Sequence, residues 1–340
     1  MGVHPLSANV DTRLISMENI CLELTAQVDN ICDYSFNFNW QDQKLDPASV
    51  IPYQQSSSYT YQDLVEALKT GNDVHIKGDV GARFAYSMGV DLEHFGGTGK
   101  PGSAGRAFVD GNVGVEAGMG MVSGILYVNG TIEQPIGNII EVRSDTEGYR
   151  KYRSITDIMC NGLGADSLIH NSLDDATLII NDDILRGTIG ARMDCRGTVI
   201  VEGDVYNGTG LLMRRGTVYI KGCAGMNTGS RLDGGTVVVS DKTDEFAGAY
   251  MKSGNLIIND AKGYVGAGMT GGAIYSKKKV SVSPPAASGK KSGENSTMLR
   301  RVLDIGRLEA MQYHKYEMGP QKPEFAKVHM RDGSVIMRKV

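Results

Sequence analysis

A short strand-like segment recurs along this chain at a nearly constant interval. Between residues 73 and 275, four to six residues rich in threonine, valine and isoleucine lead into a turn and a step that ends in Gly-x-x-Met. In the clearest stretch the segments start 21, 19, 19, 19 and 18 residues apart. Their first residues are Thr177, Thr198, Thr217, Thr236, Asn255 and Ala273. Self-similarity at such a period is typical of a solenoid, in which each repeat contacts only its neighbours.

The spacing predicts an all-β fold, a right-handed parallel β-helix of about 19 residues per coil. Strands this short and this closely spaced leave no room for a βαβ crossover, and a series of hairpins would not need a Gly-x-x-Met step in every turn. In a β-helix, equivalent residues of successive coils stack at about 4.8 Å and form ladders. The glycine at the start of each step is expected to form a corner with positive φ. One interior ladder is expected to consist of Met193, Met213, Leu232, Met251 and Met269.

The repeat divides the chain into three parts. An N-terminal segment of residues 1–72 ends in a predicted amphipathic capping helix, which has a capping box at its start and Gly71 as its stop. The β-helix follows over residues 73–276, and the repeat lapses in an irregular excursion over residues 131–176. A basic linker, helix and hairpin tail over residues 277–340 completes the chain. Because the last coil of a solenoid exposes unpaired strand edges, both terminal parts are candidates for caps.

The tail is the basic part of an otherwise acidic chain. From Lys277 onward there are 14 Lys and Arg residues against 6 Asp and Glu, although the formal net charge of the whole chain is −4. Residues 276–296 are expected to form an extended linker. A helical pattern of apolar residues then predicts a helix over 297–318, and a final hairpin is expected to join 326–330 to 335–340.

Two segments interrupt the repeat. A glycine-rich stretch over residues 89–105 carries an acidic and aromatic centre, and it is expected to be a loop outside the stack. In the lapse, Tyr149–Arg153 and Ser154–Met159 are expected to form either a short helix or an irregular excursion.

Composition limits the classes of protein to which the chain can belong. Glycine accounts for 44 of 340 residues without a Gly-X-Y period, which excludes collagen. There is no charged and then apolar leader and no apolar run of about 18 residues, so a cytoplasmic protein without membrane segments is expected. The cysteines are odd in number and scattered, which favours free thiols in a reducing cytosol over disulfides or a zinc site. They are Cys21, Cys32, Cys160, Cys195 and Cys223.

One motif imitates a cofactor-binding loop. Residues Gly266–Gly271 match the dinucleotide-binding pattern G-x-G-x-x-G. That pattern requires a helix directly after the glycines, whereas the sequence predicts another strand at Ala273–Tyr275. These glycines are therefore interpreted as a corner of the β-helix rather than as a nucleotide site.

Four basic residues lie near the corners of successive coils and could form a ladder that binds an anion. The alternative is a solvated face whose charge is offset by nearby acids such as Asp194 and Asp233. The four basic residues are Arg192, Arg215, Arg231 and Lys252.

Reactive side chains are few. The loop around His94 and the region of His170 and Cys160 contain them, but without metal-ligand spacing, and no G-x-S-x-G elbow supplies a serine nucleophile. The sequence therefore marks no catalytic, cofactor-binding or metal residue. The basic tail lacks interleaved aromatic residues, so a protein partner is favoured over nucleic acid.

The first coils resemble a known family. The segments Gly78–Met88 and Gly111–Met121 are similar to the first coils of the GXGXG domain of glutamate synthase. The same domain constitutes the β-helical subunit of formylmethanofuran dehydrogenase, and the similarity covers roughly residues 60–280. In this chain Ala85 replaces a corner glycine, and the lapse and the basic tail have no counterpart in the pattern.

The resemblance implies a β-helix without catalytic residues that braces neighbouring catalytic and iron–sulfur subunits. The expected function is therefore that of a non-catalytic structural subunit of a multi-subunit iron–sulfur redox complex, a hetero-oligomer. The chain itself is expected to bind no cofactor, with iron–sulfur clusters and molybdopterin or flavin in the partner subunits. One alternative is a stand-alone assembly module that docks through its basic tail. Another is an independent enzyme that uses the loop at 89–105 or His170.

Overall fold

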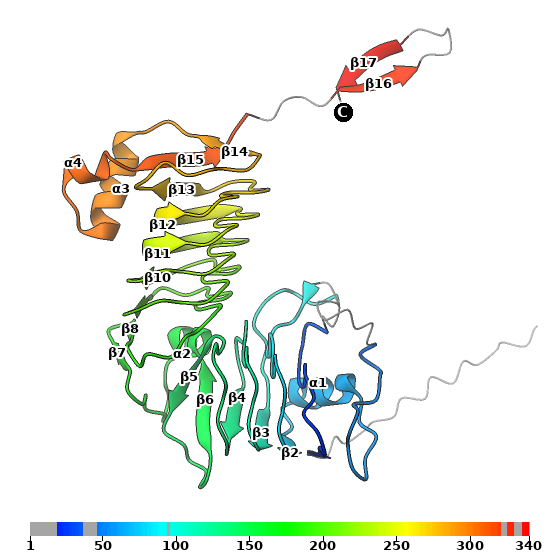
Figure 1. The fold of residues 1–340 in the computed structure, drawn as a ribbon. Coiled ribbons are helices and arrows are strands. Elements are labelled where there is room, and N and C mark those ends of the chain that lie inside the picture. The colour runs from blue at the N-terminus through cyan, green and yellow to red at the C-terminus, as the bar shows by residue number, and fades with distance from the viewer. Residues whose placement is uncertain (1–18, 37–45, 94–95, 321–324, 330–334, 340) are drawn as a thin grey trace, which may run out of the picture.

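Two stacks of short strands form the body of the molecule and meet at an angle (Figure 1). The computed structural model describes residues 19–36, 46–93, 96–320, 325–329 and 335–339. The first sheet contains, in spatial order, β1 (Ile20–Glu23), β2 (Val74–Lys77), β3 (Arg106–Asp110), β4 (Ile125–Val128), β6 (Arg150–Ser154) and β5 (Ile139–Val142). The second contains β14 (Ala286–Ser288), β15 (His314–Met318), β13 (Ala273–Ser276), β12 (Ser253–Ala261), β11 (Asp233–Thr243), β10 (Thr217–Ile220), β9 (Thr198–Val201), β8 (Thr177–Ile180) and β7 (Ser172–Asp174). The predicted parallel β-helix is confirmed, and it is divided into two stacks.

Neighbouring coils of the second stack pair in parallel and in register. Thr217 of β10 lies between Thr198 of β9 and Thr236 of β11, and the alignment continues to Asn255 and Ala273. Side chains alternate along a strand, and the second residue of each pairing segment faces inward and is fully buried: Leu178, Val199, Val218, Val237, Leu256 and Ile274. The predicted interior ladder is also confirmed, with 0% exposure at Met193, Met213, Leu232, Met251 and Met269.

The corner glycines adopt the predicted positive φ, and so do the residues two positions before and after them. In one coil the φ angles of Asn227, Gly229 and Arg231 are +60°, +67° and +54°. The next coil repeats this alternation around Gly248, and Ala85 has a φ of +54° at a corner where other coils have glycine. A left-handed conformation costs a non-glycine residue roughly 1–2 kcal/mol. The stacked neighbours must therefore hold these corners in place.

Replacing the corner residue Gly248 by alanine is expected to lower the free energy of unfolding by about 2–3 kcal/mol, because left-handed strain and overpacking add. The φ of Gly248 is +69°, and an added Cβ would lie 2.6 Å from Cδ1 of Ile274. Gly263→Ala is the matched control, since its Cβ would meet nothing within 4 Å. Urea unfolding compares the two variants. Equal losses would contradict the importance of the corner.

The first coil begins earlier than the sequence predicts. β1 pairs in parallel with β2, so a coil formed by residues 20–35 precedes the expected start at Asp73. This coil lacks the Gly-x-x-Met step. Asn30 and Cys32 occupy its left-handed positions, each with a φ of +59°, so the glycine pattern of the repeat does not extend to this coil.

The predicted N-terminal helix is confirmed as α1 (Tyr61–Lys69). The backbone N–H of Asp63 donates to Oγ1 of Thr60 at 3.1 Å, and the N–H of Thr60 donates to Oδ2 of Asp63 at 2.7 Å, which completes the capping box. Gly71 follows the helix with a φ of +86°. The apolar face of α1 joins the core of the first stack through Leu64 and Leu68.

The helix predicted over residues 297–318 is wrong in its second half. α3 (Gly293–Leu303) ends where Asp304 takes a φ of +52°, and α4 (Arg307–Ala310) is a single turn. β15 then pairs antiparallel with both β13 and β14. Because β13 would otherwise present a row of unpaired backbone groups, pairing outweighs the helical pattern of this segment.

The C-terminal helices lie over the outward face of the second stack. Leu299 and Ala310 pack against Val238, Ile257 and Tyr275 of β11, β12 and β13. This part of the tail is therefore integral to the fold. The predicted terminal hairpin is confirmed as β16 (Phe325–His329) and β17 (Val335–Lys339), and Figure 1 shows it standing clear of the body.

The lapse in the repeat is the joint between the two stacks. β5 and β6 form an antiparallel pair, so Tyr149–Arg153 is mostly strand, and α2 (Ile155–Asn161) follows. The hydrophobic core divides here. Ile139 belongs to the core of the first stack and Ile140 to that of the second, both with 0% exposure.

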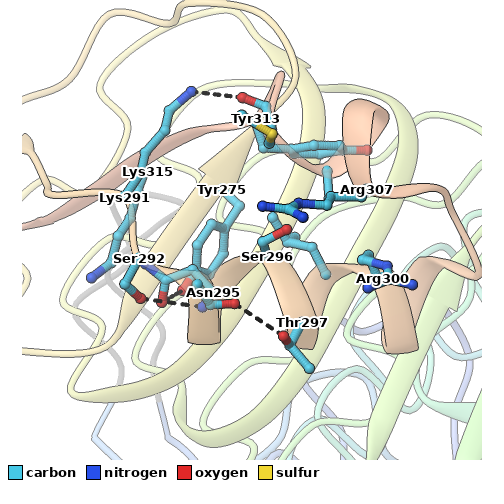
Figure 2. Close-up of a pocket in the computed structure, with 14 residues that line it drawn as sticks. Tyr275, Lys291, Ser292, Asn295, Ser296, Thr297, Arg300, Arg307, Tyr313 and Lys315 are labelled. Atoms are coloured by element: carbon cyan, nitrogen blue, oxygen red, sulfur yellow. Dashed lines mark hydrogen bonds between the residues drawn. The ribbon is translucent and has the colours of Figure 1, made fainter.

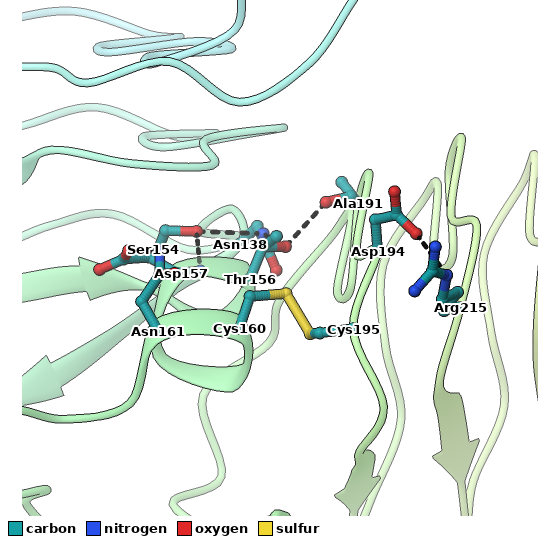
Figure 3. Close-up of a disulfide and its surroundings, with 10 residues drawn as sticks. All are labelled: Asn138, Ser154, Thr156, Asp157, Cys160, Asn161, Ala191, Asp194, Cys195 and Arg215. Atoms are coloured by element: carbon teal, nitrogen blue, oxygen red, sulfur yellow. Dashed lines mark hydrogen bonds and ion pairs between the residues drawn. A yellow bond between two sulfur atoms is a disulfide. The ribbon is translucent and has the colours of Figure 1, made fainter.

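A buried asparagine connects the two stacks (Figure 3). Nδ2 of Asn138 donates to the carbonyl of Met121 at 2.9 Å and to Oγ1 of Thr156 at 2.8 Å, while its Oδ1 accepts from the N–H of Gly190 at 3.0 Å. In the next coil, the corner N–H of Gly210 donates instead to a backbone carbonyl of the preceding coil. The side chain of Asn138 therefore replaces a backbone carbonyl at the point where the regular stack is interrupted.

A disulfide links α2 to the second stack at the same joint, between Cys160 and Cys195 (Figure 3). The prediction of free thiols is wrong for this pair. Their Cα atoms lie 5.3 Å apart although 35 residues separate them in sequence, because α2 folds against the corner that follows β8. The other three cysteines, Cys21, Cys32 and Cys223, are free thiols in the structure.

Candidate functional site

The structure separates the residues that the sequence marked as reactive. Cys160 is held in the disulfide, and His170 is exposed beside Glu141 and Asp182. His94 lies outside the described residues. Within the described part of the chain, no three His, Cys, Asp or Glu side chains are grouped closely enough to hold a metal ion.

The G-x-G-x-x-G motif lies at a corner. Gly266 and Gly268 have φ angles of +69° and +65°, and the strand β13 follows directly. In this described stretch of the chain, no helix is present to bind a pyrophosphate at its N-terminus, so the interpretation as a corner is confirmed.

The predicted basic ladder is split between two environments. Nε of Arg215 lies 3.0 Å from Oδ1 of Asp194 on an exposed face, as the solvated alternative expects. The other three predicted residues line a cavity of about 350 Å³ together with Arg214, Glu93 and Asp233. They are Arg192, Arg231 and Lys252.

This cavity lies where the loop at 89–105 approaches the second stack. Nη1 of Arg192 donates to the carbonyl of Gly99 at 3.2 Å, which bridges the two stacks. Burial and the neighbouring Arg214 guanidinium hold the pKa of Arg192 below its usual range, and Glu93 acts in the opposite direction. Arg214 was not among the basic residues predicted from the sequence. Nothing in the sequence indicates which of the neighbouring Arg214 and Arg215 side chains faces the cavity.

The outward face of the first stack carries aromatic rings and a network of charges. The rings of His75, Phe108 and Tyr127 stack with centroids 4.5 Å apart. The hydroxyl of Tyr127 donates to Asp145 at 2.7 Å, and Nζ of Lys151 donates to the same carboxylate at 2.9 Å. These two hydrogen bonds lower the pKa of Asp145 to about 2.

Stability is expected to fall between about pH 4 and pH 2, because the pKa of Asp145 is 3.8 unfolded and about 2 folded. A carboxylate with a depressed folded pKa contributes its full stability above the unfolded pKa and loses it as pH falls through the folded value. Asp145→Asn should therefore be less stable than the parent at pH 5, and the difference should shrink toward zero as pH falls through about 2. Urea unfolding across this range tests the expectation, with the exposed Asp241→Asn as control. A constant difference at all pH values would contradict it.

A further cavity lies beneath the C-terminal helices (Figure 2). It has a volume of about 670 Å³ and is enclosed by α3, α4, the end of β13 and the start of β15. Ser292 caps α3, and its Oγ accepts from the N–H of Asn295 at 3.3 Å. The hydroxyl of Tyr275 donates to Oδ1 of Asn295 at 3.2 Å, which fixes the helix against the outer face of β13.

Of the residues that the structure describes, four cations and no carboxylate line this pocket: Lys291, Arg300, Arg307 and Lys315. Nζ of Lys315 is 2.5 Å from Oε2 of Glu317, and Nζ of Lys291 donates to the carbonyl of Met311 at 2.9 Å. Figure 2 shows the guanidinium of Arg307 turned toward the side of the pocket that carries Tyr275 and Ser296. The excess of basic residues after Lys277 is visible in the sequence, but their grouping in one pocket is not, because it depends on the fold-back of β15.

Fold and surfaces together define a bent, two-stack parallel β-helix protein with a covering C-terminal cap. No protein-family model matches the chain. A stretch of 200 residues is 46% identical to an uncharacterized protein of Methanothermobacter thermautotrophicus. The match covers 58% of this chain and 64% of that protein, which is less than two thirds of the relative's length. None of the described helices combines the length and apolar character needed to cross a bilayer.

Proposed function

We propose that this chain is a non-catalytic structural subunit of a multi-subunit iron–sulfur redox complex. The observation that carries the proposal is the alternation of left-handed residues at the corners. It places positive φ at three positions, each separated by one residue, as around Gly118 and Gly229. A G-x-G-x-G sequence would favour the same backbone, which supports the resemblance to the GXGXG domain. The similar protein from a methanogen is consistent with such a setting.

In such a complex the β-helix would act as a brace. Each stack offers a long ladder of outward-facing residues, and the bend leaves the cationic cavity around Arg192 between the stacks. Iron–sulfur clusters and molybdopterin or flavin would belong to the partner subunits. The role of this chain would be to hold those subunits in a fixed arrangement.

Purification of the native protein tests this proposal. We expect the chain to be recovered in an assembly far larger than its own 36.6 kDa, together with iron–sulfur proteins that mass spectrometry identifies. Recovery as a lone monomer under mild conditions would overturn it. A tag belongs at the N-terminus, so that the C-terminal hairpin remains unmodified.

The hairpin of β16 and β17 favours a second candidate function, a stand-alone assembly module that docks through its tail. A two-stranded hairpin is marginally stable by itself in water, and an added strand or packing surface from a partner would stabilise it. Removal of residues 321–340 separates the two candidates, since it leaves the cap strand β15 in place. Loss of all partners supports the docking module, whereas an unchanged assembly supports a brace that binds through its body.

A further inference from the structure

We propose that the pocket beneath α3 and α4 binds a nucleoside phosphate, with the arginines on the phosphates and the tyrosine rings beside the base. The inference is independent of the scaffold function, because it rests on the C-terminal cap alone. The first observation is that Arg300, Arg307 and Lys291 line one cavity together with the rings of two tyrosines, Tyr275 and Tyr313.

The two arginines of the pocket are not balanced by neighbouring acids. Elsewhere in the tail, Lys277 pairs with Glu309 at 2.9 Å and Lys278 pairs with Asp260 at 3.1 Å. Among the described residues, Arg300 and Arg307 have no carboxylate within 4 Å, although this part of the chain uses carboxylates to balance other cations. Two guanidinium groups left open to one cavity favour an anion with several oxygens.

The cavity also has the size and the surfaces for the rest of the ligand. Its volume of about 670 Å³ lies within the range of about 300–1,000 Å³ that is usual for small-molecule sites. Tyr275 and Tyr313 provide rings, while Leu299 and Met311 provide apolar contact. Burial raises the pKa of Tyr313, so its hydroxyl stays protonated and can donate a hydrogen bond.

Two hydroxyl side chains of α3, Ser296 and Thr297, also line the pocket. Ser296 lies on the lining of the pocket, which Arg307 also lines. The hydroxyl of Thr297 is already used, because it donates to the carbonyl of Gly293 at 3.0 Å. Ser296 therefore offers a hydroxyl to a ribose or to a phosphate oxygen, in addition to that of Tyr313.

Isothermal titration calorimetry of the full chain with ADP, GDP and UDP tests the site. At least one of these probes is expected to bind, and the double variant Arg300→Gln with Arg307→Gln should weaken that binding by about tenfold or more, since charge-assisted bonds to phosphate are strong. Arg301→Gln is the matched control, because this neighbour of Arg300 on α3 does not line the pocket. It should leave the affinity unchanged.

Three results would overturn the proposal. One is the absence of binding for all three nucleotides at millimolar concentration. Another is equal weakening by the Arg301→Gln control, which would indicate attraction to the basic tail in general. The third is binding of inorganic pyrophosphate as tight as that of the best nucleotide, which would leave the rings without a role. Thermal unfolding of each variant shows whether the C-terminal cap remains folded.

Discussion

Asn138→Ala is expected to lower the free energy of unfolding by about 3–4 kcal/mol, a large effect for a single buried side chain. The truncation removes the acceptor of the N–H of Gly190 and the donor to the carbonyl of Met121 and to Thr156. These groups lie in a region with 0% exposure at Asn138 itself, where water cannot replace the lost partner. Urea unfolding followed by circular dichroism measures the loss.

Two further variants make the result interpretable. Asn129→Ala removes an exposed asparagine at the end of β4 and should cost no more than about 0.5 kcal/mol. Asn138→Asp keeps an acceptor for Gly190 but removes both N–H donors and buries a charge, so it should also destabilise strongly. If Asn138→Ala were as mild as the exposed control, the side chain would not join the stacks.

Cys160→Ser is the second substitution with a large expected effect, a loss of about 3–4 kcal/mol under oxidising conditions. The disulfide closes a loop with a sequence separation of 35 residues, and loop-closure entropy gives a stabilisation of this order. Thermal unfolding with and without a reductant measures it. The parent protein should lose stability when reduced, whereas the variant should not respond.

The exposed thiol Cys223 provides the control. Cys223→Ser alters a free cysteine and should leave both the stability and the response to reductant unchanged. A parent protein that is indifferent to reductant would mean that the Cys160–Cys195 bond contributes nothing to the folded state. Because the disulfide and Asn138 act at one joint, their double variant should show a non-additive loss.

The regular part of the fold was predictable because each coil repeats one local rule. Ladder residues such as Met213 and corner residues such as Gly229 could be placed by spacing alone, since parallel stacking puts equivalent positions in contact. The capping box at Thr60 was equally local. These features depend on neighbours that are close in sequence or one period away.

The joint and the first coil were not predictable for the opposite reason. Asn138 replaces a backbone group of a missing coil, and no spacing rule points to a side chain in that role. Cys160 and Cys195 are brought together only by the position of α2, and the coil at residues 20–35 has Cys32 at the corner position where most later coils have glycine. Each of these contacts depends on three-dimensional packing that the repeat does not specify.

The candidate pocket shows the same limit. The sequence located the basic residues of the tail but placed residues 314–318 in a helix. Pairing of β15 with β13 turns the chain back, and this reversal brings Tyr313 and Lys315 into the same cavity as Arg300. The basic character of the tail could be predicted from its composition. The cavity could not, because it forms only when β15 covers the edge of β13.

The division of the core between Ile139 and Ile140 has a consequence for cooperativity. In a solenoid, stability is approximately a sum of nearest-neighbour terms. Local unfolding of one coil therefore propagates only to the coils that it contacts. Two separate hydrophobic clusters that meet at a polar joint make the two stacks a pair of folding units in series. Asn138, whose hydrogen bonds reach Met121 of the first stack and Gly190 of the second, then determines whether the chain melts in one transition or in two.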